Sequence, residues 1–208
     1  MQSYSQLPQT LAVFPLANAI VLPGSSLPLN IFEPRYLKMI QDAMKTDHLI
    51  GMVQPRDNSS VPKLYQVGCA GRIIRYDETW DGRIEVIVAG LCRFRIHDEL
   101  SSMRGYRMIT PEWREFAMDF EEQEPVEAED KADFFAALRA YMKKNSMDAD
   151  WNMLERMSAE ELINSLVGIL PVGLEDKQML IEADTLVDRM QAFTAILLGQ
   201  LGSSSATH

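Results

Sequence analysis

The chain lacks the features that mark membrane-spanning and secreted proteins. Its apolar runs fall well short of the ~18 residues that a membrane helix needs. Residues 1–6 do not combine a charged start with an apolar core, so they do not form a signal peptide. Only two cysteines are present, Cys69 and Cys92, which are too few for a disulfide framework. These absences predict a cytoplasmic protein with reduced thiols and no membrane partner.

The patterns that bind phosphate, metal or an acyl intermediate are also missing. None of the 11 glycines is followed by lysine, so there is no Walker loop, and there is no Gly-x-Ser-x-Gly nucleophile elbow. The chain has no Cys-x-x-Cys pair, and its three histidines, His48, His97 and His208, are far apart in the sequence. We therefore predict no catalytic residue, no metal site, no cofactor and a non-enzymatic role.

The charge is distributed unevenly around a net value of -10. Residues 1–111 contain 12 Lys and Arg against 10 Asp and Glu, whereas residues 112–208 contain 8 against 20. Phosphate contacts need local positive charge, so an acidic chain is a poor general binder of nucleic acid. The first half is not excluded by this argument, because its arginines lie on or beside predicted strands near Tyr76 and Trp80.

The most informative segment is the proline-rich stretch from Phe14 to Tyr36. Prolines lack the N–H that a β-ladder needs, so Pro28 restricts its strand to an edge or a break. Pro34 suits the first turn of a helix, and apolar residues then recur at helical spacing over 34–45. The rest of the first half alternates as strands do, with a hairpin turn at Asp81-Gly82. Arg93, Arg95 and His97 alternate there with apolar residues, which predicts that these three side chains lie on a solvent face.

The second half changes to a helical period. Residues 115–130 contain eight acidic residues and no basic one, which indicates a solvated linker. Beyond it, apolar residues line one face of successive helices, and Ser158-Ala-Glu-Glu161 is a capping box. We predict a mainly β subdomain over 1–114, an acidic linker over 115–130, a helical subdomain over 131–201 and a disordered tail over 202–208.

Three motifs in order carry a family resemblance. They are the proline-rich segment ending in Ile31-Phe-Glu-Pro-Arg-Tyr36, the hairpin from Asp81-Gly-Arg83 to Ile96, and Leu170-Pro-Val-Gly-Leu-Glu-Asp-Lys-Gln178. Together they resemble the LON substrate-binding domain, the amino-terminal module of Lon proteases, over roughly residues 11–198. The first motif is closer to stand-alone members of that family than to the proteases. The family often has serine where this chain has Gly173 at a helix cap, a difference of only a few tenths of a kcal/mol.

The resemblance implies an α+β fold, a PUA-like β pseudo-barrel followed by a small C-terminal helical bundle. It also implies a module that recognises exposed apolar segments of unfolded polypeptides or a partner protein, with a separate protease or chaperone as a further candidate partner. The ATPase and serine-lysine peptidase parts of Lon proteases have no counterpart in the sequence. The alternative is an RNA-binding PUA-like module. Acidic residues interleaved with the arginines make nucleic acid the less favoured partner.

The candidate partner-binding residues lie where the proline-containing strand meets the helix. Such a strand leaves an edge that can receive an extended peptide by strand addition. Leu27 and Leu29 would line that edge, and Phe32 and Tyr36 are the aromatics placed to anchor an apolar residue. In the alternative interpretation both aromatic rings belong to the core.

Overall fold

The computed structural model describes residues 4–101 and 103–202, and this part of the chain forms two compact units. The first unit contains the described residues up to Glu122 together with Val172–Ile181. The second contains Gln123–Pro171 and the described residues from Glu182 onward. No helix within the described ranges is long and apolar enough to cross a membrane.

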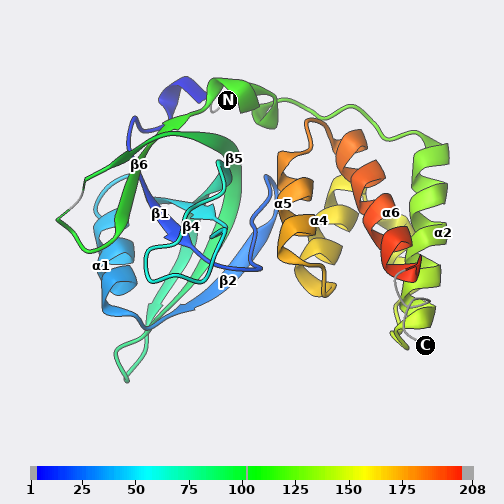
Figure 1. Cartoon of the computed structure of the whole chain (residues 1–208), viewed down its shortest axis with the longest axis horizontal. Helices are drawn as coiled ribbons and strands as arrows, with labels where there is room; N and C mark the ends of the chain where they lie inside the picture. Colours follow the sequence, from blue (N-terminus) through cyan, green and yellow to red (C-terminus); the bar gives the residue numbers. More distant parts are fainter. Residues whose placement is uncertain (1–3, 102, 203–208) are drawn as a thin grey trace. The chain divides into compact units, whose positions relative to one another are not determined.

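The first unit is a sheet that closes on itself (Figure 1). The strand order is β2-β5-β4-β3-β1-β6, and β5 also pairs with β6. Closure depends on β5, whose 17 residues pair with β2 near their start, with β6 near their end and with β4 along most of their length. The strands are β1 (Leu11–Pro15), β2 (Ser26–Ile31), β3 (Leu49–Val53), β4 (Val67–Glu78), β5 (Ile84–Leu100) and β6 (Arg107–Glu112).

Close backbone approaches inside the closed sheet explain two of its glycines. A Cβ at Gly90 would lie 2.0 Å from the carbonyl oxygen of Leu22, and one at Gly68 would lie 2.6 Å from the ring of Phe94. Only glycine leaves room at such positions. Phe94 is fully buried, and its ring meets Trp113 edge-on at 5.9 Å, so this pair forms part of the barrel core.

Three short helices and α5 complete the first unit. They are η1 (Tyr4–Gln6), α1 (Pro34–Ala43), η2 (Arg114–Phe120) and α5 (Leu174–Glu182). As predicted, α1 begins with proline at its first turn, and its buried residues recur at helical spacing. The second unit consists of α2 (Ala128–Lys144), α3 (Trp151–Arg156), α4 (Ala159–Ile169) and α6 (Leu186–Gly202).

The core of the second unit is built on α2 and α6. Phe134 and Phe193 are fully buried, and their ring centroids are 5.5 Å apart. The predicted capping box is present at the start of α4: the Glu161 N–H donates to Ser158 Oγ, and the Ser158 N–H donates to the Glu161 carboxylate. The α+β fold, with a closed sheet and helices that follow it, is therefore confirmed.

Helix α5 differs from the expected grouping of residues 131–201. It packs within the first unit, because its polar side chains bond to backbone carbonyls there: Lys177 Nζ donates to Asn18 O at 2.8 Å, and Gln178 Nε2 donates to Val67 O at 3.1 Å. The Gln54 amide adds a bond to Gln178 Oε1 at 3.1 Å. Sequence periodicity could not reveal this, because the partners lie more than 100 residues away.

The acidic stretch 115–130 is also divided differently. Its first part belongs to η2 and packs in the first unit, and its last part already belongs to α2, so the irregular segment between them is residues 121–127. Of the predicted tail 202–208, Gly202 ends α6, and the other residues lie outside the described part of the chain.

Candidate functional site

The open edge of β2 is the first element of the candidate site. Among the described strands, β2 pairs only with β5. The Gly90 N–H donates to Ser25 O at 2.8 Å, so the backbone groups of alternate residues after Ser25 point toward β5. The backbone groups of Pro28 and Asn30 therefore point away from β5, toward the open edge of β2. The missing N–H of Pro28 thus costs no bond to β5, as expected for proline on an edge strand.

A cavity of about 340 Å³ borders this edge, and we call it the β2 hollow. Most of its lining residues are apolar, and one arginine and one glutamate add charge. Its lining residues are Pro28, Leu29, Asn30, Arg75, Glu85, Val86 and Ile87. No sequence pattern indicates this hollow, because it depends on the register that places Pro28 opposite Ile87 and Arg75 on the far side of Ile87.

The four predicted binding residues occupy different environments. Leu27 and Leu29 are half-buried and lie opposite the buried Val88 and Val86 of β5. Phe32, directly after β2, is 66% exposed. Leu27, Leu29 and Phe32 are therefore positioned along or just beyond the open edge.

Tyr36 belongs to the core instead. Its side chain is only 6% exposed, and its ring lies 4.2 Å from that of Phe14. The Arg35 guanidinium lies 4.5 Å from the ring centroid. Burial raises the pKa of the Tyr36 phenol, and nearby Arg35 and Arg107 partly oppose that rise. The two aromatics therefore differ in exposure: Phe32 is exposed, and the Tyr36 ring is buried as the core interpretation expected.

The tip of the β4–β5 hairpin presents further exposed apolar groups. A register shift between Ile73 and Arg75 leaves Ile74 59% exposed, and Trp80 at the turn is 99% exposed. Gly82 adopts φ +83, which the predicted Asp81-Gly82 turn requires. Single exposed apolar side chains are ordinary at protein surfaces, so these two residues do not by themselves define a contact surface.

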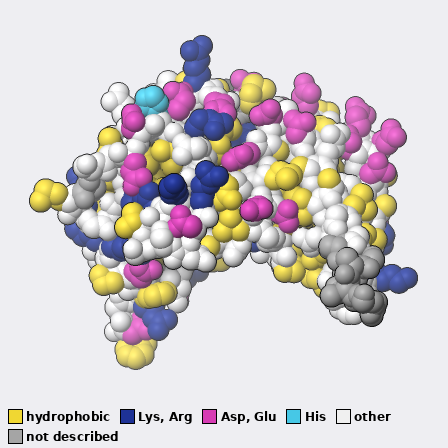
Figure 2. Space-filling model, viewed as in Figure 1, with side chains coloured by type: hydrophobic (Ala, Val, Ile, Leu, Met, Phe, Trp, Pro, Cys, Tyr) yellow, Lys and Arg dark blue, Asp and Glu magenta, His cyan; other side chains and the backbone are white. Residues whose placement is uncertain are grey.

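The arginines of the first unit are largely neutralised. Figure 2 shows Lys and Arg side chains beside Asp and Glu over this unit. Ion pairs join Arg35–Glu33, Arg75–Asp77, Arg83–Asp81, Arg93–Asp119, Arg95–Glu115 and Arg107–Glu99. A nucleic-acid surface would need unneutralised positive charge, which this arrangement reduces.

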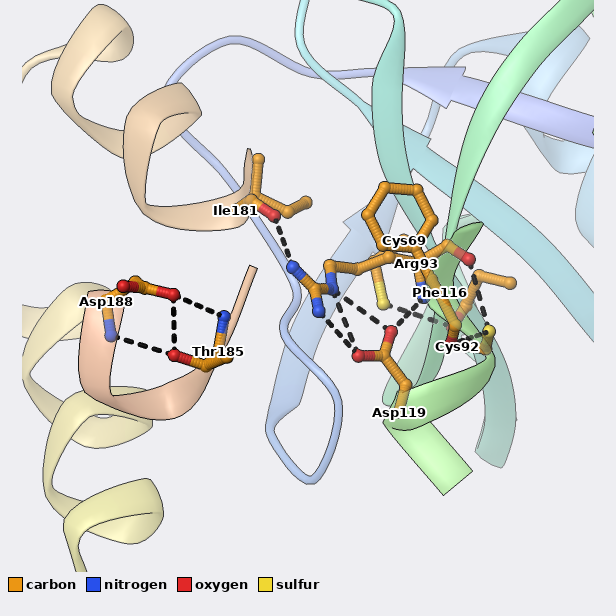
Figure 3. Close-up of polar contacts among 9 residues, drawn as sticks. Cys69, Cys92, Arg93, Phe116, Asp119, Ile181, Thr185 and Asp188 are labelled. Atoms are coloured by element: carbon orange, nitrogen blue, oxygen red, sulfur yellow. Dashed lines mark hydrogen bonds and ion pairs between the residues drawn. The ribbon is translucent and has the colours of Figure 1, made fainter. Parts of the chain in front are cut away.

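Arg93 corrects the alternation predicted from sequence. The pattern placed it with Arg95 on the solvent face, but Arg93 and Asp119 side chains are only 3% and 4% exposed (Figure 3). The guanidinium binds the Asp119 carboxylate at 2.8 Å, donates to Ile181 O at 3.2 Å and lies 4.7 Å from the Phe116 ring centroid. It therefore joins β5, η2 and α5 in the interior of the first unit.

The two cysteines lie beside this network and are both free and buried (Figure 3). Burial raises the pKa of the Cys92 thiol to about 12 and that of Cys69 still further. Thiols held in this protonated form are poor nucleophiles. Within the described residues, no group of three or more His, Cys, Asp and Glu side chains could hold a metal ion.

Solved structures of other proteins have a similar fold. The closed sheet with its helical unit is an α+β fold also found in the Lon N-terminal domain protein from Xanthomonas campestris. That structure has a TM-score of 0.66 and 23% identity, over 89% of this chain and 97% of the other. The N-terminal domain of the Mycobacterium avium complex Lon protease has a TM-score of 0.63 and 15% identity, over 91% and 98% of the two chains.

The sequence comparisons define the family. The profile of the ATP-dependent protease La (LON) substrate-binding domain matches residues 10–199, and the chain belongs to this family. Lon protease 2 of Myxococcus xanthus is 28% identical over 92% of this chain and 24% of its own length. Lon protease 2 of Thermus thermophilus is 25% identical over 94% and 25%. The chain thus spans about a quarter of the length of these relatives.

Proposed function

We propose that this chain is a non-enzymatic module that binds exposed apolar segments of polypeptides at the open edge of β2. The observation that carries the proposal is the combination of an unpaired strand edge, the adjacent β2 hollow and the exposed Phe32. An extended peptide would pair with the outward backbone groups of β2, and an apolar side chain would enter the hollow. This is recognition by strand addition, in which backbone bonds supply affinity and pockets supply preference.

The energetics suit a weak, sequence-tolerant interaction. Burying one large apolar side chain contributes about 1.5–3 kcal/mol. The edge cannot offer an unbroken row of donors, because Pro28 has no N–H. A segment with apolar residues at alternate positions would therefore be held by a few bonds and one or two side chains.

The family's name supports a substrate-binding role. The matched relatives are much longer than this chain, so their own partners are not carried over to it. We propose a separate protease or a chaperone as the partner that receives the captured polypeptides. The paired arginines favour polypeptide over RNA. We place the module in the cytoplasm, where its two free thiols would remain reduced.

Phe32→Ala tests this proposal, with Ile169→Ala as a matched control. Both residues are largely exposed, at 66% and 72%, so both variants should stay within about 0.5 kcal/mol of the parent in stability. We expect Phe32→Ala to weaken capture of fluorescein-labelled casein about fivefold or more, which corresponds to ~1 kcal/mol, and Ile169→Ala to leave capture unchanged. The casein should be recovered uncleaved.

A second variant probes the backbone. Asn30→Pro removes an outward-facing N–H and leaves the bonds to β5 in place, so it should weaken capture without unfolding the barrel. Binding should change little between 50 and 300 mM salt. Equal capture by the Phe32 and Ile169 variants, or a steep loss of affinity with salt, would rule out this site.

A further inference from the structure

A second and larger cavity opens at the start of α1, and we call it the α1 hollow. Its volume is about 440 Å³, and it shares no residue with the β2 hollow. The end of β1, the first turn of α1, residues 55–62 and the start of β6 line it. Its charged lining residues are Arg35, Asp57 and Arg107, and Tyr36 lines it as well.

The Tyr36 hydroxyl is the unusual group in this cavity. The side chain is 94% buried (6% exposed) and held by Phe14, yet its oxygen makes no hydrogen bond with any described residue. Among the described side chains, Gln54 Oε1 is the fully enclosed polar atom without a partner. The Tyr36 oxygen is therefore not fully enclosed, and Tyr36 lines the α1 hollow. Buried tyrosines normally have a hydrogen-bond partner, so a ligand can supply one here.

Charges of both signs lie near this hydroxyl. Burial and Glu33 raise the pKa of the Tyr36 phenol, whereas Arg35 and Arg107 lower it. Arg107 is fixed by Glu99 and by Pro62 O, to which its Nη1 donates at 2.6 Å. Arg35 lies over the Tyr36 ring and forms an exposed pair with Glu33, of the kind that contributes little to stability and is easily exchanged.

The N-terminus of α1 lies beside the same groups. Arg35 and Tyr36 lie in the first turn of the ten-residue α1, and the N-cap residue Glu33 makes no side-chain cap bond. Pro34 has no N–H and the Tyr36 N–H donates to Glu33 O at 2.9 Å, so the Arg35 N–H is the first-turn donor available to an anion. An open phenol O–H, an exchangeable guanidinium and a helix N-terminus together form a donor-rich site for a single oxyanion.

We propose that the α1 hollow binds a carboxylate of the captured polypeptide, donated by its C-terminus or by an acidic side chain. This subsite rests on the polypeptide-binding function proposed above. The Tyr36 hydroxyl donates one hydrogen bond to the carboxylate. The Arg35 guanidinium releases Glu33 and pairs with the carboxylate instead. A nucleic acid carries many phosphates and fits less well, because Arg75, Arg83 and Arg95 of this unit are paired with acids.

The position of the two hollows gives the bound segment a direction. Leu29 lines the β2 hollow and Arg35 the α1 hollow, and Phe32 lies between them in sequence. Six residues span at most about 20 Å, so a peptide of about ten residues reaches both. A peptide that runs parallel to β2 brings its C-terminal end to α1. Its apolar residues therefore precede the carboxylate by a few positions.

A matched peptide pair tests the subsite. The probe is a ten-residue peptide with alternating leucines, made with a free C-terminal carboxylate and as the C-terminal amide. We expect the acid to bind the parent chain at least fivefold more tightly than the amide, and Tyr36→Phe to abolish this difference. Tyr65→Phe is the control, since Tyr65 also has an arginine near its ring, at 5.3 Å, but lies outside the hollow.

The outcomes separate the two proposals. Tyr36→Phe keeps the ring and its packing, so it should melt like the parent. If acid and amide bind equally, the carboxylate subsite is wrong and the apolar site stands; if neither binds, both proposals fail. If the C-terminal amide peptide regains full affinity when it carries one aspartate near its C-terminus, the bound carboxylate can come from an acidic side chain. Tyr36-dependent binding of an oligouridylate that displaces the acid would overturn the assignment in favour of phosphate.

Discussion

Asp119→Ala should destabilise the first unit more than any exposed charge change. Asp119 accepts hydrogen bonds from the Arg93 guanidinium at 2.8 and 3.1 Å and from the Arg93 N–H at 2.8 Å, and both side chains are almost fully buried. Without the carboxylate, a buried guanidinium and a backbone N–H lose their acceptor. Breaking a buried ion pair in this way costs about 3–5 kcal/mol. Total domain stabilities of about 5–15 kcal/mol make this a large fraction.

Urea unfolding followed by the fluorescence of Trp113 measures this loss. Trp113 is buried in the barrel core, and its indole N–H donates to Pro8 O at 3.0 Å, so it reports on the first unit. Trp80 and Trp151 are replaced by phenylalanine in all variants to isolate that signal. Asp77→Ala is the control, because the Arg75–Asp77 pair is exposed and such pairs contribute little to stability.

The result that would refute this reasoning is a loss below about 1 kcal/mol for Asp119→Ala, equal to that of Asp77→Ala. A further check is the double variant Arg93→Leu with Asp119→Leu. Replacing both charges of a buried pair by apolar side chains is often neutral or stabilising. Recovery in the double variant would show that the unpaired charge, rather than lost packing, causes the damage of the single one.

Two further predictions concern the linker and the thiols. A glutamate-specific protease should cut first within residues 121–127, and the two fragments should elute together under native conditions, because α5 packs in the first unit through Lys177 and Gln178; a first cut within 66–96 would contradict this. Cys92, whose pKa is raised to about 12 by burial, should resist iodoacetamide at pH 8 until urea is added, and rapid labelling of the native protein would contradict the buried assignment.

The sequence predicted the parts of the fold that depend on local pattern. Pro34 and the apolar spacing after it located α1, Asp81-Gly82 located the hairpin, and Ser158 with Glu161 located the start of α4. Each of these signals lies within a few residues of the element it defines. Local chemistry was therefore enough to identify these elements.

The features that sequence missed depend on distant partners. Arg93 looked solvent-exposed because it alternates with buried residues, but its acceptors lie 26 and 88 residues away, at Asp119 and Ile181. Phe32 and Tyr36 are four residues apart and both aromatic, so only the packing of α1 on β1 and β3 separates the exposed ring from the buried one. Both hollows likewise arise from strand register and loop placement, which no local pattern specifies.

The proposed site also has to avoid self-association, and Pro28 explains how it does so. An open strand edge is a template for pairing with another copy, and proteins commonly blunt such edges with proline or charge. Pro28 removes one outward donor from the middle of β2, and the edge strand is only six residues long. Two β2 strands would then meet with two missing donors, whereas an incoming peptide would meet only one. The same proline therefore weakens pairing between copies more than it weakens capture of a peptide, which leaves a short, reversible contact suited to transient binding.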